Sequence, residues 1–152
     1  MMQDTNNQYD KIINICREIF LKKMKDYGTA WRTLRPSSIT DQIFIKARRI
    51  RSIEEKGTHK INEGVKPEYI GIINYAIMGL IQIQMMGKGI LTDDFIISLY
   101  DKNFDNAKEL MLEKNHDYDE VWREMRMSSY TDLILMKINR VKQIEDNQGQ
   151  TM

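Results

Sequence analysis

Hydrophobic residues recur at intervals of three and four along most of this chain, which is the spacing of amphipathic α-helices. In the first segment, Ile12, Cys16, Phe20 and Met24 follow this spacing, with Cys16 as a small core residue, and Gly28 supplies a stop signal. The pattern predicts five main helices, at about residues 9–25, 40–56, 67–86, 92–115 and 131–147. The expected fold class is therefore all-α, a helical bundle.

The third predicted helix differs from the others because it is apolar nearly all round, which favours a central place in the core. Polar residues inside it, among them Asn74, and its limited length argue against a membrane span. Gly71, Tyr75 and Gly79 fall on one face at steps of four, where another helix could approach closely.

The connectors carry helix start signals. Residues 29–39 form a connector with Trp31 and Leu34 as anchors and Pro36 at its end. We expect the hydroxyl groups of Ser37–Asp41 to cap the second helix, with anion capture at the helix start as the alternative. The fourth helix begins with a cap signal at Thr92, with an interruption near residues 101–103 as an open alternative.

Residues 22–57 recur as residues 113–148, 91 positions later and without a gap. Fifteen of the 36 aligned positions are identical, where chance gives roughly two or three. Eleven of these identities are polar or charged, whereas apolar positions drift, for example from Ile50 to Val141. The polar residues are kept between the two copies more strictly than the apolar ones, and this indicates that the polar groups have specific partners.

The repeat predicts a tandem duplication within one helical domain, residues 1–152. The first copy spans about 9–86 and the second about 101–149, and the second lacks its third helix because the counterpart would fall near 158–177. We therefore expect an exposed apolar surface in the second half. Either a second copy of the chain covers it in a homodimer, or the sequence is truncated.

Charged residues lie inside the apolar stripe of the second helix. Lys46 and Glu54 share a face with Ile43, Ile50 and Ile53. The second copy repeats this arrangement with Lys137 and Glu145. Charges on a core-facing stripe need partners or a polar cavity. Two interpretations remain open: an ion-pair network involving Asp26 and Arg49, or a ligand cavity between the helices.

Composition narrows the function classes. The net charge of +1 gives no global attraction to nucleic acid or membrane, and no helix shows an unbroken basic face, so duplex DNA is disfavoured. The single Cys16 excludes an internal disulfide, and with no signal-like start the chain is expected in the cytoplasm. His59, His116 and Cys16 show no zinc spacing.

Three stretches, Lys22–Gly28, Lys46 with Arg49, and Ile73–Ala76, resemble the signature of the nucleotide modification associated domain 1 family. This is a small all-helical group of bacteria and phages, and the resemblance implies a nucleotide context without naming a reaction. Two positions depart from the pattern of this family. Asp119 replaces a glycine in the second copy, and Gly71 stands where many relatives resemble an Asp-x-x-Asn-Tyr pattern. The third helix also looks loosely like that of all-α nucleotide pyrophosphohydrolases, but their paired carboxylates are not matched.

Three functions follow as hypotheses: a module that binds a nucleotide or another phosphate-bearing ligand, a magnesium-dependent pyrophosphohydrolase-like enzyme, and a non-enzymatic helical interaction protein. The candidate ligand-binding residues are Asp26, Tyr27, Trp31, Arg32, Arg35, Lys46, Arg49, Glu54, Asn74, Tyr75, Asp117, Tyr118, Trp122, Lys137, Arg140 and Glu145. Magnesium would be needed only by the enzyme, and its candidate ligands are Asp26, Glu54 and Glu68.

Overall fold

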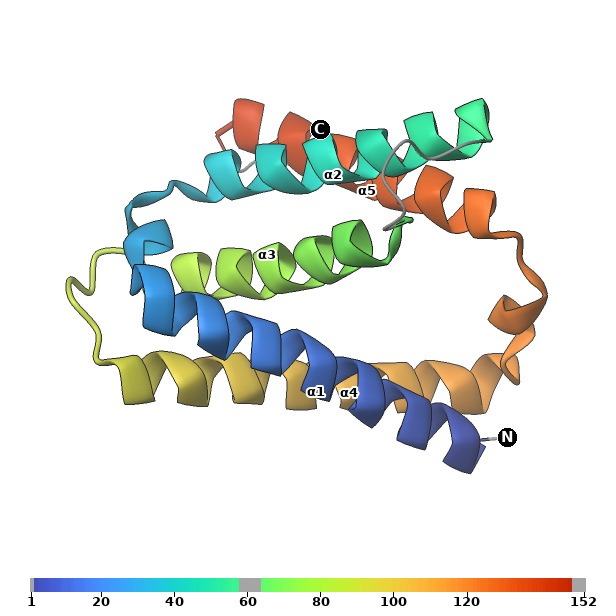
Figure 1. Ribbon diagram of the computed structural model, residues 1–152, viewed down its shortest axis with the longest axis horizontal. Coiled ribbons are helices and arrows are strands. Elements are labelled where there is room, and N and C mark those ends of the chain that lie inside the picture. Colours follow the sequence, from blue (N-terminus) through green and yellow to red (C-terminus); the bar gives the residue numbers. More distant parts are fainter. Residues whose placement is uncertain (1, 58–63, 149–152) are drawn as a thin grey trace. The chain divides into compact units, whose positions relative to one another are not determined.

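The computed structural model describes residues 2–57 and 64–148, and every regular element within them is helical (Figure 1). The elements are α1 (Met2–Tyr27), η1 (Ala30–Thr33), α2 (Pro36–Lys56), α3 (Lys66–Gln84), α4 (Asp93–Tyr118), η2 (Val121–Glu124) and α5 (Met127–Asp146), where η marks a single 3₁₀ turn. The predicted all-α class with five main helices is confirmed. None of the described helices is long and apolar enough to cross a membrane.

The chain forms two compact units, each built from both halves of the sequence. Unit 1 comprises Met1–Thr33 and Leu80–Glu124, and unit 2 comprises Leu34–Gly79 and Met125–Met152. Unit 1 therefore contains α1 and α4, whereas unit 2 contains α2, α5 and most of α3. The prediction of a single domain stays a prediction.

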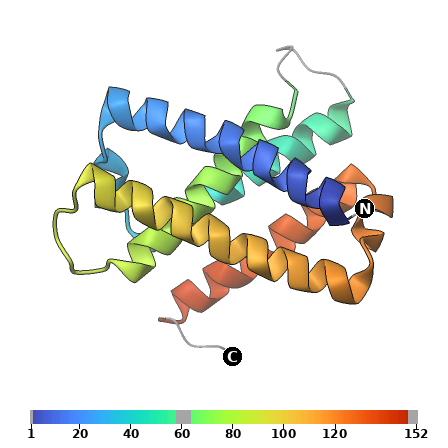
Figure 2. The same cartoon turned by 90° about the horizontal axis from the view of Figure 1, so that it is seen from below.

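In unit 1, α1 and α4 lie side by side in opposite directions (Figure 2). Aromatic rings fill the space between them: Phe20 and Tyr100 are stacked with ring centroids 4.3 Å apart, and Tyr100 and Phe104 meet edge to face with centroids 4.8 Å apart. Cys16 is fully buried in this core, as predicted, and burial raises the pKa of its thiol. Arg17 bridges the helices through two hydrogen bonds to the Asp101 carboxylate, 2.8 and 3.1 Å.

In unit 2, α2 and α5 pack along each other (Figure 1), and α3 lies against α2. The shared core consists of Ile39, Ile43, Ala47, Ile50, Ile72, Leu135 and Ile138. The glycine face of α3 contacts α2, because a Cβ at Gly79 would lie 3.4 Å from Ile39 Cγ2. The predicted close approach of a helix at this face is confirmed.

Several helix ends differ from the prediction. Pro36 opens α2 as its first residue, since proline needs no hydrogen-bonded amide there, and the N-cap is Arg35 without a side-chain cap bond. The capping role expected for Ser37–Asp41 is therefore wrong, and these residues lie inside the helix. Similarly, α4 runs without interruption past residues 101–103. Thr92 does cap α4, accepting a 3.2 Å hydrogen bond from the backbone N–H of Phe95.

The helix boundaries repeat with the same 91-residue offset as the sequence. Tyr27 and Tyr118 end α1 and α4, and the 3₁₀ turns span 30–33 and 121–124. Asp119 stands where the first copy has Gly28, and both take the left-handed conformation, with φ of 57° and 62°. That the repeat arose by duplication stays a prediction.

Candidate functional site

Two cations on α2 share one buried carboxylate on α3. Lys46 and Arg49 are three residues apart and therefore neighbours on the helix surface. Glu68 lies in the first turn of α3, directly after Pro67. Arg49 Nη1 lies 3.0 Å from Glu68 Oε1, and Lys46 Nζ lies 3.6 Å from Glu68 Oε2. The side chain of Glu68 is only 11% exposed, whereas those of Lys46 and Arg49 are 27% and 55% exposed.

Gly71 makes room for the Lys46 side chain. A Cβ at Gly71 would lie 2.7 Å from Lys46 Cε and 2.8 Å from Cδ, closer than any ordinary contact. Lys46 Nζ also lies 5.9 Å from the centroid of the Tyr75 ring, at the outer limit of a cation–π contact. The lysine is therefore positioned by three neighbours on one helix: a carboxylate, a glycine and an aromatic ring.

The cluster of Lys46, Arg49 and Glu68 contains two cations and one carboxylate, and it therefore keeps a net positive charge. Because 3.6 Å exceeds hydrogen-bond length, Glu68 pairs with Lys46 through charge, without accepting a hydrogen bond from it. Arg49 has five N–H donors, only some of which can face Glu68. The expected ion-pair network thus includes Lys46 and Arg49, but its carboxylate is Glu68 instead of Asp26, which is exposed in unit 1.

The two glutamates of the apolar stripes cross-link α2 and α5. Thr40 Oγ1 donates a 2.8 Å hydrogen bond to Glu145, and Thr131 Oγ1 donates a 3.1 Å hydrogen bond to Glu54. Each threonine also contacts the carbonyl four residues before it in its own helix. These reciprocal contacts relate the helices by an approximate two-fold and explain four of the repeated polar residues by packing alone.

The spacing of the threonines and glutamates in the sequence is a signal for this cross-link. Thr40 and Glu54 are 14 residues apart, nearly four helical turns, so both face the same way. The second copy keeps the same spacing between Thr131 and Glu145. Two antiparallel copies of such a helix bring each threonine to the opposite glutamate.

The repeated Trp-Arg pairs anchor the 3₁₀ turns of unit 1. Arg32 donates to the side chain of Gln82 and to the carbonyl of Gly89, at 3.2 Å in the latter case. Trp31 packs against Phe20, with ring centroids 6.2 Å apart. These contacts give Trp31 and Arg32 structural roles.

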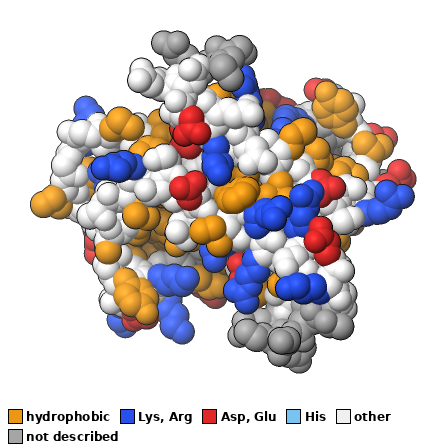
Figure 3. Space-filling view, turned by 90° about the horizontal axis from the view of Figure 1, so that it is seen from above, with side chains coloured by type: hydrophobic (Ala, Val, Ile, Leu, Met, Phe, Trp, Pro, Cys, Tyr) orange, Lys and Arg blue, Asp and Glu red, His pale blue; other side chains and the backbone are white. Residues whose placement is uncertain are grey.

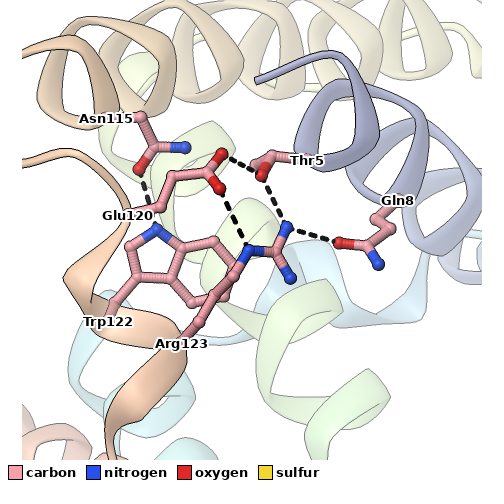
Figure 4. Close-up of polar contacts among 6 residues, drawn as sticks. All are labelled: Thr5, Gln8, Asn115, Glu120, Trp122 and Arg123. Carbon is pink, nitrogen blue, oxygen red and sulfur yellow. Dashed lines mark hydrogen bonds and ion pairs between the residues drawn. The ribbon is translucent and has the colours of Figure 1, made fainter. Parts of the chain in front are cut away.

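The second turn is tied to the start of α1 (Figure 4). Arg123 Nη2 donates to Thr5 Oγ1 at 2.6 Å and to Gln8 at 2.8 Å, and the Thr5 hydroxyl donates to Glu120. That hydroxyl, together with the adjacent Arg123, lowers the pKa of the Glu120 carboxyl. Trp122 donates from its ring nitrogen to Asn115 Oδ1 at 2.8 Å, and the Arg123 guanidinium lies over its ring.

The remaining candidates are spread over both units. Those in unit 1 are all exposed near the C-terminal ends of α1 and α4: Asp26, Tyr27, Asp117 and Tyr118. In unit 2 the exposed ones are Arg35, Lys137 and Arg140, and Asn74 is buried within α3. The structure brings together Lys46, Arg49 and Tyr75 with Glu68, and separately Glu54 with Thr131 and Glu145 with Thr40.

The three metal candidates have different surroundings. Glu68 is held by Lys46 and Arg49, Glu54 accepts a hydrogen bond from Thr131, and Asp26 is exposed in unit 1. Within the described ranges, no group of three or more His, Cys, Asp or Glu side chains is placed to hold a metal ion.

Comparison with known proteins gives one finding. No curated protein and no solved structure matches the chain. The model of one family, described as nucleotide modification associated domain 1, matches residues 23–83 and 114–152, which together make up more than half of the chain. The two matched segments begin 91 residues apart, the offset of the internal repeat. The chain therefore belongs to the nucleotide modification associated domain 1 family.

Proposed function

We propose that this protein binds a phosphate-bearing ligand of the nucleotide class, through Lys46 and Arg49 of unit 2. One observation carries the proposal: two partly exposed cations share a single buried carboxylate, which leaves a net positive charge at a fixed position. An anion is the natural complement of such a charge.

The geometry supports phosphate in particular. Glu68 holds the Arg49 fork on one side, so the outward N–H groups are orientated before a ligand arrives, and this lowers the entropic cost of binding. The planar guanidinium can donate two parallel hydrogen bonds to phosphate oxygens, and the ammonium of Lys46 adds a second positive charge three residues away. Tyr75, beside Lys46, offers an aromatic surface close to the cations.

The family supports the ligand class, because its description associates it with nucleotide modification. A nucleotide ligand also agrees with the predicted cytoplasmic location, which remains part of the proposal, whereas the homodimer stays a prediction. The face drawn in Figure 3 does not favour the binding of duplex DNA, because its Lys and Arg side chains are interspersed with acidic and hydrophobic ones.

Calorimetric titration with ATP, GTP, CTP and UTP in the presence of EDTA tests the proposal. We expect metal-independent binding by the full chain. Each of Lys46→Met and Arg49→Gln should lower affinity by roughly tenfold to a hundredfold, since a hydrogen bond to a charged group contributes about 1.5–3 kcal/mol. Arg48→Gln is the matched control, because Arg48 is exposed on the same helix outside the cluster.

Two outcomes would overturn the proposal. One is the absence of binding to any of the four nucleotides. The other is equal affinity of wild type, Lys46→Met and Arg49→Gln, which would place the ligand elsewhere. Binding that requires magnesium and releases pyrophosphate would replace the binding module with the hydrolase hypothesis.

A further inference from the structure

One face of α5 combines exposed apolar residues with two cations. Leu133, Lys137, Arg140, Val141 and Ile144 fall within an arc of about 100° around the helix. We call these five residues the open face of α5. Leu133 and Val141 are each 40% exposed, and both cations are exposed as well. Within the described part of the chain, the Arg140 side chain donates a hydrogen bond only to Gln143 of its own helix, at 3.4 Å.

The equivalent face of α2 is covered. The positions 91 residues earlier are Gln42, Lys46, Arg49, Ile50 and Ile53. There α3 supplies Glu68 to both cations and Gly71 to the lysine stem, and Ile50 is 0% exposed. The reciprocal Thr–Glu contacts show that α2 and α5 are related by an approximate two-fold, so the two faces are equivalent in structure as well as in sequence.

The open face of α5 therefore lacks the kind of partner that α3 provides for the equivalent face of α2. No described carboxylate is paired with Lys137 or Arg140 as Glu68 is with Lys46 and Arg49. The apolar character is also greater, because Leu133 replaces Gln42. An exposed leucine and valine beside two cations fit a surface that an apolar helix with one carboxylate would cover.

We propose that the open face of α5 binds a partner helix with the chemistry of α3. This helix has an apolar surface, a glutamate in its first turn that reaches Lys137 and Arg140, and a glycine three residues later that admits the Lys137 stem. The proposal is independent of nucleotide binding at Lys46 and Arg49, because it concerns the other copy of the cation pair.

A peptide with the sequence of residues 64–86, which includes α3, is the probe. It carries a fluorescent label and two added lysines for solubility, and anisotropy measures its binding to the full chain. We expect saturable binding. The double variant Lys137→Glu/Arg140→Glu should bind at least tenfold more weakly, and a peptide with Glu68→Lys should restore binding to that variant. Arg48→Glu/Lys56→Glu, which changes the net charge equally at exposed positions of α2, should bind as wild type does.

A second measurement guards against poor behaviour of the peptide. Residues 58–86 are appended after Gln148, which places a second α3 at the 91-residue offset of the repeat. The extended chain should have a higher Tm than the original, and Glu68→Lys in the appended copy should remove most of the gain. The Tm of the two-cation variant Lys137→Glu/Arg140→Glu should rise less than that of wild type on the same extension.

Three results would overturn the proposal. Equal peptide binding by wild type and the double variant would show unspecific apolar contact. An extension that raises Tm in neither form would show that the face does not accept this helix. If the chain instead forms a dimer in sedimentation, and Lys137→Glu/Arg140→Glu makes it monomeric without any peptide binding, the occupant is a second copy.

Discussion

Substitution of Gly71 tests the position of Lys46 directly. In Gly71→Ala the new methyl group would lie 2.7 Å from Lys46 Cε, so the lysine side chain must move. Gly79→Ala is the matched control on the same helix, because its nearest side-chain atom, Ile39 Cγ2, lies 3.4 Å away. Both changes replace a glycine in the interior of α3.

The two substitutions share one favourable contribution and differ in the unfavourable ones. Replacing glycine by alanine within a helix contributes about 1 kcal/mol to stability. In Gly71→Ala, pushing Lys46 away from its preferred rotamer costs about 1 kcal/mol. Weakening its partly exposed ion pair with Glu68 costs up to about 1 kcal/mol more. Gly71→Ala should therefore be neutral or about 1 kcal/mol less stable than wild type, whereas Gly79→Ala should be about 1 kcal/mol more stable.

Thermal denaturation and ATP calorimetry together form the assay. A change of 1 kcal/mol corresponds to a Tm shift of about 2–4 °C for a chain of this size. Gly71→Ala should also weaken ATP binding, because Lys46 leaves its position, and Gly79→Ala should not. In a Lys46→Ala background the obstacle is gone, and Gly71→Ala should stabilise by about 1 kcal/mol. Equal stabilisation by both alanines in both backgrounds would refute the reasoning.

Three further predictions concern the scaffold. Thr40→Val and Thr131→Val each remove the hydroxyl donor of a partly buried carboxylate, and each should lower the free energy of unfolding by about 1–2 kcal/mol in urea denaturation. Ser37→Ala should lower it by less than about 0.5 kcal/mol, and a larger loss would support a capping role for Ser37. The pKa of Glu120 is lowered from 4.5, chiefly by a hydroxyl donor, so its contribution to stability is present above pH 4.5 and is lost as pH falls through the folded-state pKa. The urea midpoint should therefore fall in acid less steeply in Glu120→Gln than in wild type, and parallel profiles would contradict this. Cys16 should react with a thiol reagent only at the rate of unfolding, because it is buried and its pKa is raised; fast reaction of the folded chain would contradict the described core.

Periodicity was enough to predict the fold class and the existence of each main helix. The stripe of α2 was correct because Ile43, Ala47 and Ile50 are buried at the expected spacing. The sequence predicts the start of α2 four residues late, because Ser37 and Thr40 resemble caps and Pro36 resembles a stop. Proline and hydroxyl residues are compatible with both places, and only the backbone conformation at Arg35 decides between them.

The candidate site was harder to predict because its partners lie on other helices. The position of Lys46 inside an apolar stripe correctly indicated a partner, but no local pattern names Glu68, which is 22 residues away. Gly71 departs from an acidic pattern in the sequence, but its role in admitting the Lys46 side chain depends on the crossing of two helices. The repeated identity of Arg32 and Trp122 has a structural explanation in their hydrogen bonds to Gln82 and Asn115, which no local sequence pattern indicates.

The central claim is that Lys46 receives an anion, and the signal of this one side chain tests it most directly. Reductive methylation with ¹³C-formaldehyde labels each lysine and preserves its charge, and Lys46→Arg identifies the resonance of Lys46. On titration with ATP in EDTA, we expect the Lys46 signal to shift and saturate, while those of exposed lysines such as Lys56 stay nearly unchanged. An unmoved Lys46 signal at saturating nucleotide would contradict the account.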